Sequence, residues 1–259
     1  MPRFPFSEWH AEQLRLTVFP VLGATTRSPE WWEFVVASPP DETNSNLRKG
    51  TTVVGGAFAP GKLILGLAPD RIDWLFVPPD PELDAGLPES GFVSIGPVRE
   101  ALRTFSDVAE RWFGRDDVPE IARVAFGAIL THAEPDRRSA YALLPDYVPV
   151  RVDPDSSSDF LFQINLPVAS TTIDGLRLNR LTRLAVASVS QLTLRFTAGA
   201  AGAAVASQAR PPFAHALRLE LDINTVAEFQ GPIPRRDLIR VYRELVALGE
   251  GIATGGIGS

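Results

Sequence analysis

The chain has 259 residues, of which 45% are hydrophobic and 22% are charged, so it can bury a large core and is not a disordered polypeptide. Its formal net charge of −6 argues against a whole-surface attraction to nucleic acid or anionic lipid, although a local basic patch stays compatible with it. The chain has no cysteine, which excludes disulfides, thiolate chemistry and zinc–sulfur sites.

The N-terminal residues and the apolar runs bear on location. Residues 1–9 have no apolar core of the kind that a secretory signal carries. No run reaches the about 20 apolar residues that a membrane-spanning helix needs. The candidate closest to one, residues 198–209, is rich in alanine and glycine and too short. We therefore expect a soluble, cytoplasmic protein that does not enter a membrane.

The first third of the chain predicts strands and loops. Alternation of apolar with other residues is the period of a strand with one buried face, and aromatic and β-branched runs favour strands as well. These patterns predict strands at residues 14–19, 31–37, 51–58, 62–68 and 72–77, with loops at residues 38–46 and 78–91. Tight turns join the last three strands, so we expect them to form an antiparallel meander.

A helix is predicted in the middle of the chain. Pro97 is placed for a first helical turn, and Gly114 is placed for a helix end. Between them, apolar residues recur at helical spacing, namely Val98, Ala101, Leu102, Phe105, Val108, Ala109 and Trp112. We expect an amphipathic helix over residues 97–113 that lies across one face of the sheet.

The second half repeats the order of strands and then a helix. Strands are predicted at residues 124–130, 147–152, 160–166 and 217–223, with an exposed acidic loop at residues 153–159. Residues 181–196 fit one long strand or two, and residues 198–209 fit a flexible loop or a short helix. A last amphipathic helix is predicted at residues 234–248, followed by a glycine-rich tail that we expect to be mobile at its end.

This order of elements predicts an α+β fold, because the alternation of single strands and helices that is typical of parallel sheets is absent. We expect a mainly antiparallel β-sheet built of meanders, with two long amphipathic helices packed on it, in one domain over residues 1–259. The repeated order also suggests a pseudo-duplication with halves at residues 1–115 and 116–259, although the halves share no residue pattern that can be aligned.

The polar residues form no recognisable catalytic or ligand-binding motif. His10, His132 and His215 lie far apart without a second ligand at metal spacing, so we expect a structural role for each. The acidic loop at residues 153–159 lacks the glycine and the glutamate of a calcium loop. The glycine pair at residues 55–56 is not followed by the helix start of a phosphate-binding loop. We expect no catalytic, cofactor-binding or metal site.

Aromatic and basic residues form a candidate partner surface. Exposed tryptophan is typical of such surfaces, and on a strand Trp31 and Trp32 would point to opposite faces. Trp9, Arg235 and Arg236 complete this candidate set. Packing in the core is the alternative for the tryptophans, and a salt-bridged surface is the alternative for the arginines.

Three segments of the chain resemble a sporadically distributed family of uncharacterised prokaryotic proteins of similar length. The segments are the arginine-led strand at residues 121–130, the late strand at residues 217–224 and the closing helix at residues 238–252. The late strand reads Leu219-Glu220-Leu221-Asp222-Ile223-Asn224, similar to a Leu-x-Leu-Asp-Ile-Asp motif of the family. The mid-chain strand departs from the family in its apolar end, Ala128-Ile129-Leu130. The resemblance implies a shared fold and no activity.

We expect a non-enzymatic binding or assembly protein, a subunit or partner in a bacterial multiprotein complex, which binds another protein or itself without a cofactor. The alternative is an enzyme whose site is assembled from distant residues. Its first candidates are His132, Arg123, Asp146 and Asp222, because they lie on strands or at strand ends. A second alternative is a nucleic-acid-associated protein with an arginine-rich face, which the net charge disfavours.

Overall fold

The computed structural model describes residues 4–21, 29–80, 91–189, 192–199, 202–209 and 214–258. The strands of the main sheet are β1 (His10–Pro20), β2 (Glu42–Asn46), β3 (Thr51–Phe58), β4 (Gly61–Ala68), β5 (Arg71–Val77), β6 (Gly96–Pro97), β7 (Ile121–Glu134), β8 (Leu161–Asn165), β9 (Val168–Ala169), β10 (Arg177–Val189) and β13 (Ala214–Thr225). The remaining strands are β11 (Leu192–Gly199) and β12 (Gly202–Ala209).

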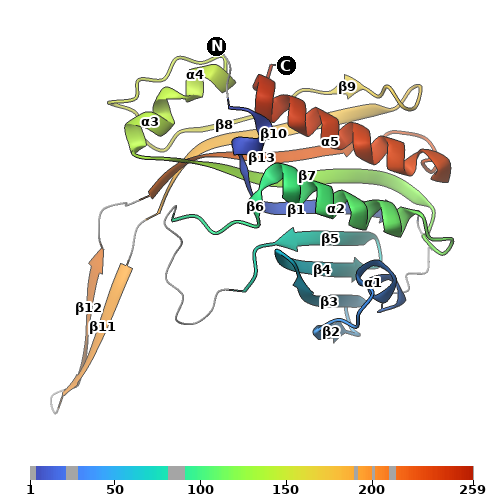
Figure 1. Ribbon diagram of the computed structural model, residues 1–259, viewed down its shortest axis with the longest axis horizontal. Helices are drawn as coiled ribbons and strands as arrows, with labels where there is room; N and C mark the ends of the chain where they lie inside the picture. Colours follow the sequence, from blue (N-terminus) through green and yellow to red (C-terminus); the bar gives the residue numbers. More distant parts are fainter. Residues whose placement is uncertain are drawn as a thin grey trace.

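The main sheet has 11 strands in the order β2-β3-β4-β5-β1-β7-β13-β10-β8, with β6 beside β1 and β9 beside β10 (Figure 1). All of its pairings are antiparallel. The expected α+β fold with a large antiparallel sheet is therefore confirmed. The hairpin of β11 and β12 forms a separate two-stranded sheet that projects from the main body in Figure 1.

The helices are α1 (Pro29–Val36), α2 (Val98–Phe113), α3 (Arg137–Ala142), α4 (Leu144–Tyr147) and α5 (Leu238–Gly255), with short 3-10 turns η1 (Phe6–Glu8) and η2 (Arg235–Asp237). The two longest, α2 and α5, lie side by side across one face of the sheet, where α2 contacts β1, and α5 contacts β7 and β13 (Figure 1). α1 packs beside α2 at the β3 end of the same layer.

The core lies between this helical layer and the sheet. The apolar phase of the central strands points toward the helices, as in Leu16 of β1, Phe126 of β7 and Leu219 of β13, which are all buried. The stripe of α2 that includes Phe105 and Trp112 is buried against them. Burial of one large apolar side chain contributes about 1.5–3 kcal/mol, so this single interface accounts for much of the driving force of folding.

Three segments differ from the sequence-based expectation in the first half and the middle of the chain. Most of the strand expected at residues 31–37 lies in helix α1 (Pro29–Val36), because Trp31, Trp32 and Val35 reach the core from one side of a helix. The polar segment expected to be a loop contains strand β2, which pairs with β3 from Glu42 to Asn46 despite its turn-forming residues. No strand lies at residues 147–152, since α4 ends at Tyr147.

The region after β9 also differs. The described residues of the range 181–196 belong to two strands, β10 and β11, and the described part of residues 198–209 is strand, neither loop nor helix. The expected glycine-rich tail is helical as far as Gly255. A Cβ atom at Gly249 would lie 3.1 Å from the Phe126 ring and 3.3 Å from Leu221, so glycine lets α5 approach β7 and β13 closely.

Candidate functional site

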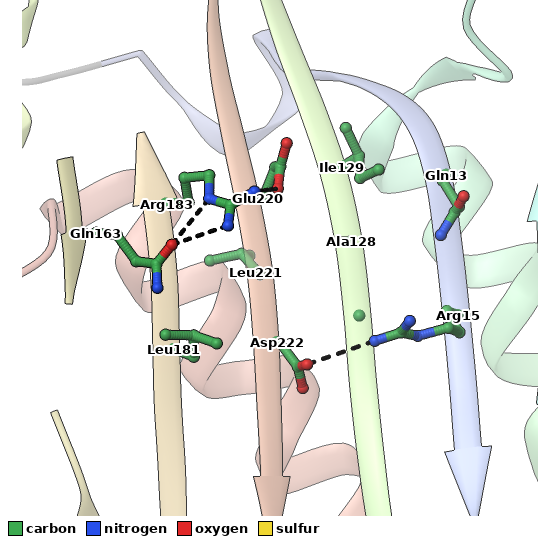
Figure 2. Close-up of a pocket in the computed structure, with 11 residues that line it drawn as sticks. Gln13, Arg15, Ala128, Ile129, Gln163, Leu181, Arg183, Glu220, Leu221 and Asp222 are labelled. Atoms are coloured by element: carbon green, nitrogen blue, oxygen red, sulfur yellow. Dashed lines mark hydrogen bonds and ion pairs between the residues drawn. The ribbon is translucent and has the colours of Figure 1, made fainter. Parts of the chain in front are cut away.

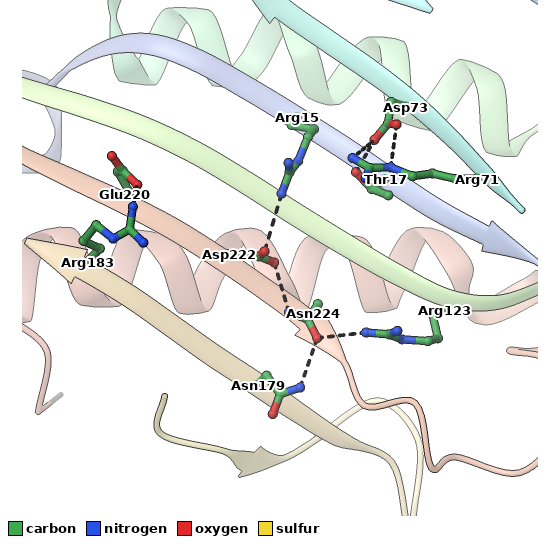
Figure 3. Close-up of polar contacts among 10 residues, drawn as sticks. All are labelled: Arg15, Thr17, Arg71, Asp73, Arg123, Asn179, Arg183, Glu220, Asp222 and Asn224. Atoms are coloured by element: carbon green, nitrogen blue, oxygen red, sulfur yellow. Dashed lines mark hydrogen bonds and ion pairs between the residues drawn. The ribbon is translucent and has the colours of Figure 1, made fainter. Parts of the chain in front are cut away.

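The sheet face opposite α2 and α5 carries a continuous set of polar side chains, which we call the open face (Figures 2 and 3). Both figures view the sheet from this side, with helices behind the strands. The open face holds the phase of the strands that alternates with the core residues. It is formed by Glu12, Gln13, Arg15, Thr17, Arg71, Asp73, Arg123, Gln163, Asn179, Arg183, Arg218, Glu220, Asp222 and Asn224.

One row of contacts runs across four strands. The Arg15 guanidinium reaches from β1 over β7 to Asp222 of β13, with 3.5 Å between Nη2 and Oδ2 (Figure 3). Gly127 of β7 leaves room for this crossing, since a Cβ atom there would lie 3.1 Å from Arg15 Nε and the side chain would have to shift slightly. Asn224 Nδ2 donates to Asp222 Oδ1 at 3.0 Å, and Asn224 Oδ1 accepts from Asn179 Nδ2 of β10 at 3.0 Å.

A second row joins β8 to β1. Arg183 donates to Gln163 Oε1 at 3.0 and 2.8 Å from Nε and Nη2, and to Glu220 Oε2 at 3.1 Å from Nη1 (Figure 2). Glu220 also pairs with Arg218, whose Nε donates to Glu12 at 3.0 Å. Basic and acidic side chains therefore alternate along this row.

A depression of about 220 Å³ lies between the two rows (Figure 2). Its walls include Arg15, Arg183 and Asp222, and Gly127 and Leu181 belong to its apolar part. Arg15 is the under-bonded group of this site. Its ion pair with Asp222 is 3.5 Å long, and its Nε is buried without a hydrogen-bond partner in the described part of the chain. A carboxylate or amide oxygen would satisfy such a guanidinium.

A second pocket, of about 190 Å³, lies at the end of β7 and contains His132. The His132 ring lies 2.9 Å from Glu134 through Nδ1 and 3.6 Å from Glu8 through Nε2. The Phe4 ring stacks on it with 3.5 Å between ring centroids. Its ring is thus held on one face and by both nitrogens, in keeping with a structural histidine. His10 lies 3.4 Å from Ser94, and His215 lies 2.9 Å from Ser188.

The four residues of the enzyme alternative do not form one site. Arg123 and Asp222 both contact Asn224 on the open face, at 3.4 and 3.0 Å. His132 lies in the second pocket, and Asp146 lies in α4, where its carbonyl faces Gly256. The order of residues in the chain could not show this separation.

The expected partner surface is corrected for its aromatic members. Trp9, Trp31 and Trp32 are fully buried. Neighbouring residues of a helix are about 100° apart and not on opposite faces as in a strand, so both Trp31 and Trp32 reach the core. Trp9 also lies there and donates to the carbonyl of Ala253 at 3.1 Å. Arg235 and Arg236 are on the surface, near Asp116 and Asp237.

Trp31 is attached to the loop after α2 through Asp117. The indole Nε1 of Trp31 donates to Asp117 Oδ2 at 3.1 Å, and Arg115 donates to both carboxylate oxygens at 2.7 and 2.8 Å. These hydrogen bonds, chiefly that from Arg115, lower the pKa of Asp117 to about 2. The charged carboxylate therefore helps to hold α1 against α2.

Asp117→Asn should remove stability in a pH-dependent way. Because folding lowers this pKa, the contribution is present above the unfolded-state value near 4 and is lost as the pH falls toward 2. We expect the variant to be about 1 kcal/mol less stable than the wild type at pH 7, allowing for solvent screening of this partly exposed pair. Urea unfolding at pH 7 and pH 3 measures the difference in free energy of unfolding between the two proteins, which should be smaller at pH 3. Asp116→Asn, at a fully exposed neighbour, is the control and should show no such trend.

Within the described ranges, no group of three or more histidine, aspartate or glutamate residues could hold a metal ion. Likewise, no helix in the described part of the chain has the length and apolar character to cross a membrane. Comparisons with protein-family models, curated proteins and solved structures gave no match to the chain. The family resemblance seen in the sequence therefore stays a prediction.

Sequence reasoning missed the open face as a site. A signal for it was present, since Arg218, Glu220 and Asp222 occupy one phase of a strand. Arg15 holds the equivalent phase near the N-terminus, but nothing in the sequence indicates that β1 and β13 both pair with β7.

Proposed function

We propose that the protein is a non-enzymatic binding or assembly protein that docks a protein partner on the open face. The observation that carries the proposal is the under-bonded Arg15 guanidinium at the depression of that face. The Arg15 side chain is 26% exposed, so a partner's carboxylate or backbone carbonyl would bond its terminal nitrogens. The surrounding rows of paired charges, partly withdrawn from water already, would then contribute specificity more than affinity.

A protein partner is favoured over nucleic acid by the pairing of the charges. Arg15, Arg71, Arg183 and Arg218 each lie beside a carboxylate, so the open face offers phosphate groups no uncompensated row of cations. The enzyme alternative has less support, because His132 and Asp222 line different pockets.

We also propose that the chain is one domain built by duplication, with halves at residues 1–115 and 116–259 and with α2 and α5 as equivalent amphipathic helices. The element order supports this. Each half has a long strand, a short helical segment, a run of three strands and a long helix. In the first half these are β1, α1, β3-β4-β5 and α2. In the second half they are β7, α3-α4, β8-β10-β13 and α5. From the central β1–β7 pair outward, the sheet order β1-β5-β4-β3 matches β7-β13-β10-β8.

Reversing one charged pair of the open face should separate partner binding from folding. Arg183→Glu places two carboxylates together and should weaken partner binding at least tenfold. The double variant Arg183→Glu, Glu220→Arg restores the internal pair, so it should recover wild-type stability but not affinity. The partner would be captured by cross-linking in the native cells, and its Kd measured by calorimetry with each variant.

The control for this experiment lies on the helical side. Arg99 of α2 is well exposed and only 3.8 Å from Glu250, so Arg99→Glu should leave partner affinity unchanged. Equal affinity of the wild type and the double variant would contradict docking on the open face. Salt-sensitive binding of single-stranded or duplex DNA or RNA at low ionic strength would favour the nucleic-acid alternative instead.

A further inference from the structure

The two edges of the main sheet differ in chemistry. At one edge, β2 is short, polar and fully exposed, and it covers β3. At the other edge, β8 has the uncharged sequence Leu-Phe-Gln-Ile-Asn, and Leu161 is 59% exposed. In the proposed duplication β8 is the equivalent of β3, yet in the described part of the chain no strand covers its outer side. Natural proteins seldom leave an apolar edge strand uncovered.

The outward backbone groups of β8 follow from its pairing with β10. The Leu166 N–H donates to the carbonyl of Arg180, so Phe162 and Ile164, at the same phase, also direct their backbone groups toward β10. Leu161, Gln163 and Asn165 therefore direct their N–H and C=O groups away from the sheet. This row of donors and acceptors has the spacing that an additional β-strand satisfies.

An apolar groove of about 410 Å³ lies beside the same edge, on its helical side. Its lining includes Tyr147, Val148, Pro149, Phe162, Ile164 and Ile257. Phe162 and Ile164 are only half-buried there. A strand added to β8 would place every second side chain over this groove, so the added segment should be apolar at alternate positions.

We infer that β8 pairs antiparallel with β8 of a second copy of the chain, about a two-fold axis at Gln163. In this register Phe162 of one copy faces Ile164 of the other, twice, and these apolar pairs cover both grooves. Antiparallel pairing about a two-fold axis is the commonest symmetry of homodimers. Cross-strand apolar pairs of this kind each contribute favourably to sheet stability.

Charge complementarity favours a second copy as the occupant. The acidic loop with Asp153, Asp155 and Asp159 comes directly before β8. Arg180 lies at the other end of β8, where its Nε donates to the carbonyl of Leu166 at 2.9 Å. In the proposed register the start of one β8 lies opposite the end of the other, which brings the acidic loop of one copy toward Arg180 of the other. Symmetry generates this acidic–basic contact twice.

A cysteine placed on the axis tests the inference directly, because the chain has no cysteine of its own. In the dimer, two copies of Gln163→Cys would have Cα atoms about 5.5 Å apart, within the range that a disulfide spans. We expect more than half of this variant to become a disulfide-linked dimer under mild oxidation. Asn44→Cys, in the middle of the opposite edge strand β2, is the matched control and should stay monomeric on denaturing gels.

Light scattering of the protein without cysteine gives an independent measurement. The wild type should have the mass of a dimer at micromolar concentration, and Gln163→Pro should have that of a monomer, because proline removes an outward N–H while β10 keeps its own bonds. Gln163→Ala loses only the side-chain contact with Arg183 and should remain a dimer.

A monomeric wild type at 100 µM together with no cross-linking of Gln163→Cys would overturn the inference, and so would a dimer that persists in folded Gln163→Pro. If Gln163→Pro does not fold, the cysteine pair decides alone. Dimerisation and docking on the open face are distinguishable, since Arg183→Glu with Glu220→Arg should leave the dimer intact while weakening partner binding at least tenfold.

Discussion

Trp112→Ala should lower the free energy of unfolding by about 4 kcal/mol, the range observed when large aromatic side chains are removed from cores. Trp112 is fully buried on α2, and its ring centroid lies 5.5 Å from that of Trp31, 6.2 Å from that of Trp74 and 5.2 Å from that of Phe113. It thus joins α1, α2 and β5, which leaves no single neighbour able to fill the cavity. Denaturant unfolding followed by fluorescence measures the loss, which is large against a typical total stability of about 5–15 kcal/mol.

The matched pair for this prediction is Trp112→Phe and Trp9→Phe. In the described part of the chain the Trp112 indole nitrogen has no hydrogen-bond partner, whereas that of Trp9 donates to the buried carbonyl of Ala253. Trp9→Phe should therefore cost about 1 kcal/mol more than Trp112→Phe, because it leaves a buried acceptor unsatisfied. The opposite order would show that shape and not hydrogen bonding dominates at both sites.

Gly61→Ala should destabilise the protein by about 2–3 kcal/mol, the range of overpacking in a tightly packed sheet. A Cβ atom at Gly61 would lie 2.3 Å from the backbone oxygen of Val77, so the first residue of β4 would have to move away from β5. No flexible side chain can absorb this contact, since the obstructing atom belongs to the main chain. The midpoint of urea unfolding measures the effect.

Gly66→Ala is the control within the same strand. A Cβ atom there would contact only the Cβ of Asp73 at 3.8 Å, an ordinary van der Waals distance. We expect this variant to be neutral or stabilised by about 0.5 kcal/mol, because alanine restricts the unfolded chain more than glycine does. A comparable loss of stability in both variants would mean that β4 tolerates no added Cβ atom at either glycine, contrary to the contact distances given for Gly66.

Some parts of this fold follow from the sequence because burial on one face imposes a strict period. Residues 62–68 and 217–223 alternate, and both lie in strands with alternating burial. Where a segment is short or polar the pattern carries less information. α1 consists of residues that favour strands, and β2 consists of residues that favour turns, so tertiary packing and pairing decided both.

The candidate site was less accessible to sequence reasoning than the fold. Arg15 and Asp222 are 207 residues apart, and their contact crosses a third strand above Gly127. Trp9, Trp31 and Trp32, by contrast, were predicted to belong to a partner surface because of their residue type, and they are core residues. Residue type alone could not show that the tryptophans are buried or that Arg15 and Asp222 meet. The second contact depends on the order of β1, β7 and β13, which non-local pairing sets.

The central position of β1 and β7 has a consequence for how the chain folds during synthesis. β1 pairs with β5, so the five-stranded unit of β1 to β5 with α2 can close once α2 has left the ribosome. β7 can then add to β1, but its other edge waits for β13, which follows only after α3, α4 and β8 to β12 have been made. Until then one edge of β7 is unpaired, and the part of its core phase that α5 and β13 later help to cover, including Phe126, is exposed. Non-local pairings of this kind fold slowly, so this edge stays open while the later strands are made.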